Sequence, residues 1–246
     1  MAGHSKWKQI KHKKAKTDAA RGKVFTKLIK EITVAARGGG GDEAANPRLR
    51  TAILLAKGAN MPQQNIDRAI KKGTGELPGV SYDEITYEAY APGGTALLIE
   101  CLTDNKNRSV AEIRHLLSKF GGNLGESGSV GWMFARRYEV VVPLQGMTED
   151  ELMEIALEAG AEDFSVENGE ALVTCLPEEI ESVKQAMEDN DISVGSAELA
   201  MIPQNTVKVE GRNAEKLFDL MERLEDHDDV QNIYSNFDVD TEDFGG

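Results

Sequence analysis

Apolar residues recur along the chain at two spacings, and the change from one to the other separates a helical region from a mixed region. Over residues 24–37 they return every three or four positions, as on the buried face of an amphipathic helix. Similar periods predict two more helices, over residues 46–58 and 62–73. Residues 5–20 contain too few apolar positions for a wide buried face, so we expect them to be poorly ordered before a partner binds.

Capping and turn residues mark the ends of these helices. Asn46 followed by Pro47 is typical of an N-cap and a first helical residue, and Gly73 predicts a C-cap. The run from Gly38 to Gly41 indicates a mobile loop that ends the first helix. It lacks a preceding strand and a following Gly-Lys-Ser/Thr, so we exclude a phosphate-binding nucleotide loop.

Beyond the turn-rich segment 73–81, the pattern changes to that of β-strands. The runs ITYEAYAP and TALLIECLTD are joined by Pro-Gly-Gly at residues 92–94 and predict a hairpin. A helix is expected from about residue 107, and a glycine pair ends it. We expect a domain boundary at residues 73–81, because the turn residues there coincide with a reversal of charge.

Residues 137–202 have the order of a complete ferredoxin-like sandwich, β-α-β-β-α-β. Thr148 and Pro177 open its two predicted helices, and Asn168-Gly169 predicts a two-residue hairpin. The elements on either side would form a second sandwich by pairing with each other. The expected fold is α+β: a small helical N-terminal domain, then two ferredoxin-like α/β sandwich domains, one inserted in the other. The expected domains are residues 1–79, residues 80–136 plus 203–246, and residues 137–202.

Charge is strongly segregated along this chain of net charge −14. The first 37 residues contain nine Lys and two Arg, against only Asp18 and Glu31. Up to Glu76, Lys and Arg number 17 against 6 acidic residues, whereas the remainder holds 11 against 36. The basic end should attract phosphate and the acidic remainder should repel it, which restricts the surface that a nucleic acid can contact.

The basic residues of the N-terminal region are the candidate nucleic-acid contacts. Trp7 could stack on a base or be buried against Ile10, and Lys71 with Lys72 could bind phosphate or cap a helix end. Lysines neutralise phosphate without reading bases, so no sequence-specific helix is indicated. The full candidate set is His4, Lys6, Trp7, Lys8, Lys11, His12, Lys13, Lys14, Lys16, Arg21, Lys23, Arg48, Arg50, Lys71 and Lys72.

The sequence gives little support to an enzyme, a metal site or a membrane protein. Its four His residues are scattered, and no metalloprotease, paired-Cys, nucleophile-elbow or Walker motif is present. The acidic cluster at residues 226–229 is expected to be solvated surface, and Cys101 and Cys175 to be free, buried thiols. No apolar run is long enough to span a bilayer, so we expect a cytoplasmic protein. Because the motifs named above are absent, we also expect no cofactor and no metal.

Several long motifs carry a resemblance to a known family. They are MAGHSKWKQIKHKKAKTDAARGKVFTKL, NPRLR, ANMPQQNIDRAIKKGTG, YEAYAPGG, ECLTDNKNRSVAEIRH, GGNLGESGSVGWMF and MIPQNTVKVEG. On these residues, which extend over nearly the whole chain, the sequence resembles the YebC family. The resemblance implies a helical domain and two α/β domains. It also implies one of two functions, since members are described as DNA-binding transcriptional regulators and others as translation factors.

The residues themselves separate DNA from RNA poorly. A Lys-rich, extended arm suits the irregular phosphate surface of ribosomal RNA at least as well as a duplex groove, and no helix-turn-helix or zinc pattern is visible. We expect a non-enzymatic nucleic-acid-binding regulator of gene expression, and the resemblance to the YebC family implies the DNA-binding transcriptional type. The alternative that the resemblance implies is a ribosome-associated translation factor that binds RNA and relieves stalling, for example at proline runs. A protein-interaction adaptor that uses the acidic sandwiches is a third class; the oligomeric state is open.

Overall fold

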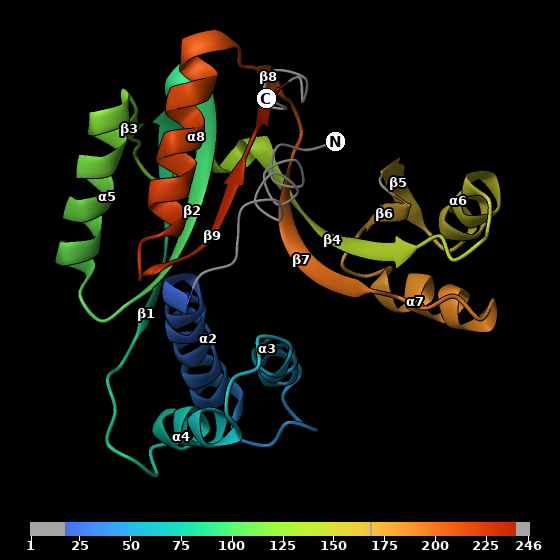
Figure 1. Ribbon diagram of the computed structural model, residues 1–246, viewed down its shortest axis with the longest axis horizontal. Coiled ribbons are helices and arrows are strands. Elements are labelled where there is room, and N and C mark those ends of the chain that lie inside the picture. Colours follow the sequence, from blue (N-terminus) through green and yellow to red (C-terminus); the bar gives the residue numbers. More distant parts are fainter. Residues whose placement is uncertain (1–17, 168, 240–246) are drawn as a thin grey trace.

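A computed structural model of the chain describes residues 18–167 and 169–239. It is an α+β protein in which three N-terminal helices, a central sheet and a second, outlying sheet follow one another (Figure 1). The predicted fold class is confirmed. No helix within the described residues is both long enough and apolar enough to cross a membrane.

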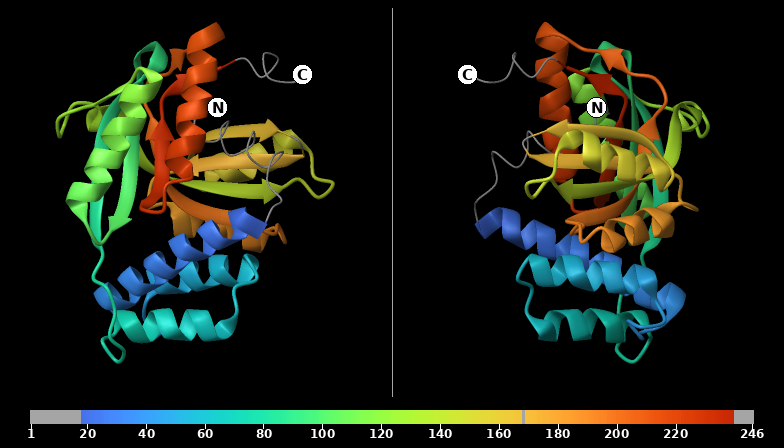
Figure 2. Two further views of the ribbon diagram at one scale, coloured as in Figure 1. Left: turned by 60° about the vertical axis from the view of Figure 1, so that its left-hand side comes forward. Right: turned by 90° about the vertical axis from the view of Figure 1, so that its right-hand side faces the viewer.

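The N-terminal helices are α2 (Asp18–Gly39), α3 (Pro47–Gly58) and α4 (Gln63–Gly73). Figure 2 shows α3 and α4 lying beneath α2, on the side away from the sheets. Apolar side chains of all three helices form one core, which contains Ile32, Ala36, Leu49, Ile53, Ile66 and Ala69. All three helices were predicted, but α2 already begins at Asp18, so the poorly ordered region expected through residue 20 is helical from Asp18 onward.

Asn46 connects the end of α2 to the start of α3. Its side-chain oxygen accepts a hydrogen bond from Leu49 N at 3.1 Å, which is the predicted N-cap. Its Nδ2 donates to Ala35 O at 2.8 Å and to Gly40 O at 2.9 Å. The prediction of a mobile glycine loop from Gly38 is therefore wrong in part, because Gly38 and Gly39 are helical and Asn46 holds the carbonyl of Gly40.

Replacing Asn46 by Ala should lower the free energy of unfolding by about 2 kcal/mol. The variant loses an N-cap, for which about 1 kcal/mol is typical, and leaves the Ala35 carbonyl without its side-chain donor. Asn46→Asp is the matched control, since it keeps the cap oxygen but loses both amide donors. Denaturant unfolding should rank wild type above Asp and Asp above Ala; equal stability of all three would contradict the double role.

Gly73, the last residue of α4, is not the C-cap that was predicted, and the structure gives another reason for a glycine at this position. The C-cap residue is Thr74, in a right-handed conformation. A Cβ on Gly73 would lie 2.4 Å from Thr33 O and 2.7 Å from Ala36 Cβ, both on α2. The glycine therefore lets α4 approach the backbone of α2.

The central sheet has the strand order β3-β1-β2-β9. Helices α5 and α8 cover one face, as Figure 1 shows, and the core between them includes Leu97, Ile99, Ile113, Leu117, Leu217 and Leu220. The predicted hairpin around Pro92 joins β1 and β2 in register. The elements are β1 (Asp83–Ala91), β2 (Thr95–Thr103), α5 (Lys106–Phe120), β3 (Asn123–Leu124), α8 (Gly211–Glu225) and β9 (Val230–Ser235).

Four short elements complete this region. The 3-10 helix η1 (Pro92–Gly94) lies in the turn between β1 and β2. The 3-10 helix η2 (Gly131–Met133) lies directly before the strand that begins at Phe134. Strands β8 (Val207–Lys208) and β10 (Phe237–Asp238) form a separate parallel pair. Cys101 is a free, buried cysteine, and burial raises the pKa of its thiol to about 12.

The second sheet has the strand order β5-β6-β4-β7, and α6 and α7 cover one face. This is the ferredoxin-like order predicted for residues 137–202. Thr148 is the N-cap of α6, whereas α7 begins at Ile180, three residues after the predicted start at Pro177. The elements are β4 (Phe134–Pro143), α6 (Glu149–Glu158), β5 (Ala161–Glu167), β6 (Glu170–Cys175), α7 (Ile180–Asp189) and β7 (Ser196–Pro203).

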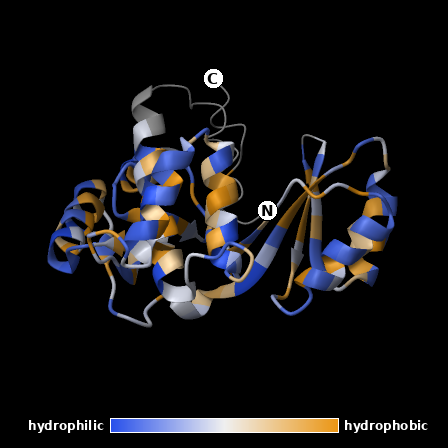
Figure 3. Cartoon of the chain, turned by 90° about the horizontal axis from the view of Figure 1, so that it is seen from below, coloured by the Kyte–Doolittle hydropathy of each residue, from blue (hydrophilic) through white to orange (hydrophobic). Residues whose placement is uncertain are grey.

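Strands β4 and β7 carry the chain into and out of the outlying sheet. They pair antiparallel from Phe134↔Pro203 to Val141↔Ser196, so both crossings belong to one hydrogen-bonded ribbon. Figure 3 shows this ribbon, in part apolar, running from the central region to the outlying sheet. Its inner end packs on the central sheet through Phe134, Ala200 and Tyr234. We propose to keep the three-domain division, with the junction inside β4 and β7.

Candidate nucleic-acid interface

Most of the predicted contact residues lie outside the described residues. These are His4, Lys6, Trp7, Lys8, Lys11, His12, Lys13, Lys14 and Lys16. Arg21 belongs to the first turns of α2, which begins at Asp18, two residues after Lys16. The described residues therefore give the attachment of the basic segment rather than its contact surface.

Three lysines of α2, spaced by four and three residues, attach the helix to the last residue of α8 and to the segment that follows it. Lys23 Nζ lies 3.0 Å from Asp226 Oδ2, and Lys27 Nζ donates to Glu225 O at 2.7 Å. Lys30 is buried, and its Nζ lies 2.6 Å from Asp229 Oδ1. The spacing places all three on one face of the helix, so the basic pattern in this part of the sequence is a docking pattern.

Asp229 is the centre of the joint between α2 and the central sheet. Its Oδ2 accepts hydrogen bonds from Ser109 Oγ at 2.7 Å, from Arg108 Nη2 at 2.9 Å and from Thr103 Oγ1 at 3.1 Å. Lys30 Nζ also donates to the carbonyls of Asp228 and Leu102. The side chain of Asp229 is 3% exposed, and both oxygens of its carboxylate have a donor.

The pKa of Asp229 is far below its usual range. Burial acts to raise it, but hydrogen bonds from Lys30, Ser109 and Arg108 outweigh burial and stabilise the charged carboxylate. His227 lies beside it, with Nε2 2.8 Å from Glu112 Oε2 and Nδ1 accepting from Asp229 N at 3.1 Å. The prediction that residues 226–229 are solvated surface is therefore wrong for Asp229, which is a buried ion-pair partner.

A polar cleft of about 580 Å³ opens over this joint. Lys23, Tyr82, Arg108 and Asp226 are among its lining residues, and they come from α2, the residue before β1, α5 and the segment after α8, respectively. Lys30 Nζ lies 5.6 Å from the ring centroid of Tyr82. The charged groups at its floor are already paired, so the cleft is a consequence of the docking of α2.

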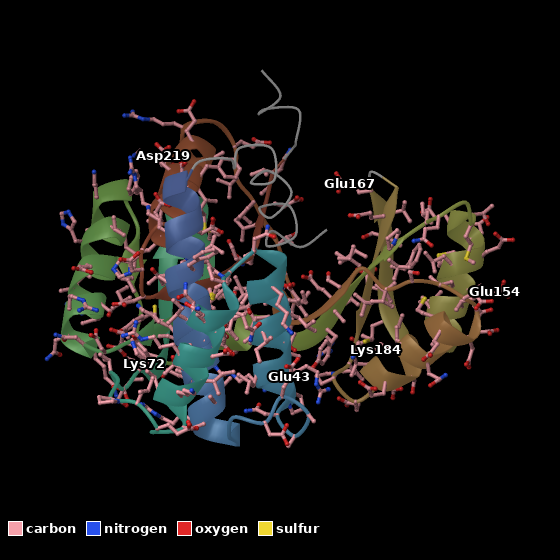
Figure 4. All side chains as sticks on the ribbon, turned by 60° about the horizontal axis from the view of Figure 1, so that its bottom comes forward. Glu43, Lys72, Glu154, Glu167, Lys184 and Asp219 are labelled. Atoms are coloured by element: carbon pink, nitrogen blue, oxygen red, sulfur yellow. The ribbon has the colours of Figure 1, made fainter. Side chains whose placement is uncertain are left out.

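The remaining predicted cations lie in α3 and α4. Arg48 is held by two carboxylates, with Nε 2.7 Å from Glu31 Oε1 and Nη2 2.9 Å from Glu84 Oε2. Hydrogen bonds to Glu31 and then Glu84 raise the pKa of its guanidinium further. Arg50 donates to the carbonyls of residues 43 and 44, near the residue Glu43 labelled in Figure 4.

Lys71 and Lys72 occupy the last turn of α4, and Lys72 is labelled in Figure 4. Gly73, directly after them, packs on Thr33 and Ala36 in the C-terminal half of α2, whereas Lys23 lies near its other end. Because the 22 residues of α2 span roughly 33 Å, the structure separates Lys71 and Lys72 from Lys23 along the length of α2.

Two family profiles match the chain in sequence order. The profile described as the TACO1/YebC protein N-terminal domain matches residues 5–76, and the one described as the TACO1/YebC second and third domain matches residues 82–237. The chain belongs to the TACO1/YebC family. The gap between the profiles, residues 77–81, contains the linker after α4, where Arg37 is hydrogen-bonded to Ser81.

Full-length relatives in the TACO1/YebC family carry a regulatory name. A probable transcriptional regulatory protein of Desulfotalea psychrophila is 58% identical over 243 residues, 98% of this chain and 97% of the relative. One from Geobacter sulfurreducens is 55% identical over 242 residues, 98% of each chain. The crystal structure of a conserved hypothetical protein from Aquifex aeolicus is 46% identical and has a TM-score of 0.81, covering 92% of this chain and 94% of that chain.

One feature of this TACO1/YebC chain was missed from the sequence. In the glycine-rich loop before β4, the Glu88 carboxylate accepts hydrogen bonds from Gly128 N and Val130 N at 2.6 Å and from Gly131 N at 2.7 Å. Burial acts to raise the pKa of Glu88, but these backbone donors lower it overall. Glycines at every third position from 122 to 131 were a visible signal, but the partner of the loop is about 40 residues earlier in the chain.

Proposed function

We propose that this protein is a non-enzymatic, nucleic-acid-binding regulator of gene expression that acts in the cytoplasm and contacts phosphate through the basic segment at the start of the chain. The segregation of charge carries the proposal: 17 Lys and Arg against 6 Asp and Glu up to Glu76, and 11 against 36 afterwards. Phosphate is attracted to the first part and repelled by the second. The regulatory names of the relatives support the same class.

The contacts of α2 support an oriented basic arm. Lys23, Lys27 and Lys30 are bound to the last residue of α8 and the segment after it, so they fix the helix that the arm enters. The residues proposed to meet phosphate are therefore those before Lys23, with Arg21 and the lysines at positions 6 to 16 as the main contributors. We propose DNA as the polymer, in agreement with the transcriptional names of the relatives.

A ribosome-associated translation factor that binds RNA is the second candidate. It is favoured by the excess of Lys over Arg in the first 37 residues, nine against two, because lysines neutralise phosphate without reading base edges. Such a protein would relieve stalling, for example at proline runs. Irregular ribosomal RNA offers the dense phosphate that this composition suits.

Replacing Lys11, Lys13, Lys14 and Lys16 by Ala should flatten the salt dependence of nucleic-acid binding. If each lysine neutralises one phosphate, the slope of log K against log salt should fall by about 3 to 4. The measurement is a fluorescence-anisotropy titration of labelled duplex DNA and of labelled RNA at several salt concentrations. An unchanged slope for both polymers would remove the arm from the interface.

The matched control removes four positive charges from the acidic domains, by changing Lys106, Lys119, Lys184 and Lys216 to Ala. Net charge changes equally in the two variants, so only a local contact can make the slopes differ. Crosslinking in cells then separates the candidates: specific promoter DNA is expected for a transcriptional regulator, and ribosomal RNA with salt-sensitive co-sedimentation for a translation factor.

A further inference from the structure

Trp132 is the most exposed large hydrophobic side chain of the described residues, at 65%. It lies in η2, directly after the loop that Glu88 organises. Its indole Nε1 donates to Ser129 O at 3.1 Å, so the polar edge of the ring is already satisfied. What the ring leaves open to solvent is aromatic surface, which an isolated globular protein normally buries.

The loop holds this ring in a fixed place. The Glu88 carboxylate accepts hydrogen bonds from three backbone N–H groups of the loop. Tyr90 Oη donates to Ser129 O, the carbonyl that also receives the indole N–H. Val130 is buried against the central sheet and anchors the loop from below. Exposure of Trp132 is therefore a property of an ordered, well-bonded segment.

We propose that Trp132 is a stacking platform for an unpaired base of a bound single-stranded nucleic acid. A base needs only one flat ring that it can approach freely, and stacking on an aromatic side chain is tolerant of base identity. The neighbouring glycines add no side chain, and a Cβ on Gly128 would meet nothing within 4 Å. A protein hot spot is instead surrounded by other apolar contacts, whereas residues 125–129 of this loop are glycine, serine and glutamate, and the apolar Val130 is buried.

The charges close to the ring permit a nucleic acid in a domain that is otherwise acidic. The carboxylate of Glu88 is turned into the loop, where three backbone N–H groups compensate its charge. Arg136, exposed on β4 four residues after the ring, forms no ion pair with another described residue. It is the nearest cation along the chain for the phosphate that accompanies a stacked base.

This inference rests on the proposed function, because the arm must supply most of the affinity. Asp83 pairs with Thr103, which contacts Asp229 at the α2 joint, and Glu88 lies five residues further along β1. At strand spacing, the platform is about 17 Å from the level of that joint. A strand held by the arm would have to extend over that distance to reach Trp132.

The test uses full-length protein carrying Trp7→Phe, which leaves Trp132 as the only tryptophan. Its fluorescence should be quenched saturably by a 20-nucleotide oligouridine and not by duplex RNA of equal length. Trp132→Ala should weaken oligouridine binding by about 5- to 100-fold, Trp132→Phe by much less, and neither should change the salt slope or duplex binding. Glu88→Ala should make Trp132 more accessible to acrylamide and weaken oligouridine binding by a smaller factor.

Two results would overturn the platform while leaving the proposed function intact. One is oligouridine binding with unchanged fluorescence and equal affinity in Trp132→Ala. The other is quenching by RNA-free ribosomal proteins but not by RNA, which would assign the ring to a protein contact. Absence of salt-dependent binding to any nucleic acid would instead contradict both the proposed function and the platform.

Discussion

Replacing Asp229 by Asn should lower the free energy of unfolding by about 3 kcal/mol. The carboxylate is buried and accepts from Lys30 through one oxygen and from Ser109, Arg108 and Thr103 through the other. An amide of the same shape must turn its NH2 group toward one of these sets of donors. Lys30 then keeps a buried charge without a counter-charge, which is the costly way to break an ion pair.

The matched control is Asp226→Asn, in the same segment and facing the same helix. The pair of Asp226 with Lys23 is exposed, with 52% and 41% of the two side chains accessible. Pairs of this kind contribute up to about 1 kcal/mol. Denaturant unfolding and hydrogen exchange of the α2 amides should show a large loss for Asp229→Asn and a small one for Asp226→Asn. Similar losses in both variants would show that burial of the pair is irrelevant.

Acid should remove the difference between wild type and Asp229→Asn. The folded pKa of Asp229 is depressed below the ordinary value of about 3.9. The contribution of the Asp229 carboxylate to the free energy of unfolding is therefore complete above that value. It is lost as the pH falls from there through the folded pKa. The stability gap should stay constant from about pH 8 to pH 5 and narrow below about pH 4.

The sequence predicted the elements of the fold better than the contacts between them. Local signals were sufficient for α3, opened by Asn46, and for the β-α-β-β-α-β order of the inserted domain, because caps, hairpins and apolar periods act over a few residues. The start of α2 was missed for the opposite reason. The first turns of α2 lead into residues that the ion pair between Lys23 and Asp226 holds in place. A prediction from the number of apolar residues cannot detect such an ion pair.

The candidate site shows the same division. Lys23 was grouped with the phosphate contacts and Asp229 with the solvated acidic surface, since a lysine run and an acidic run each look solvated when considered alone. Lys30 and Asp229 are 199 positions apart, so their pairing is a property of the fold. The segregated charge consequently has two roles in this chain. Lys23, Lys27 and Lys30 dock the basic segment on the acidic body, and within that segment only the residues before Lys23 remain for phosphate.

Gly73→Ala should destabilise the N-terminal domain by about 1 to 3 kcal/mol, although alanine is the better helix former. The new methyl would lie 2.4 Å from Thr33 O and 2.7 Å from Ala36 Cβ, so α4 must move away from α2. A backbone oxygen cannot rotate aside as a flexible side chain does, and overpacking of this size outweighs the gain of about 1 kcal/mol in helix propensity.

Gly38→Ala provides the control, because Gly38 is also helical and a Cβ there meets nothing within 4 Å. It should stabilise α2 by up to about 1 kcal/mol. Chemical denaturation followed by circular dichroism, with exchange of the α4 amides, distinguishes the two signs. If both substitutions change the free energy of unfolding in the same direction, the close approach of α4 to α2 is not what requires glycine at position 73. If they respond oppositely, the packing at Gly73 holds α4, and with it Lys71 and Lys72, against the helix that docks on Asp229.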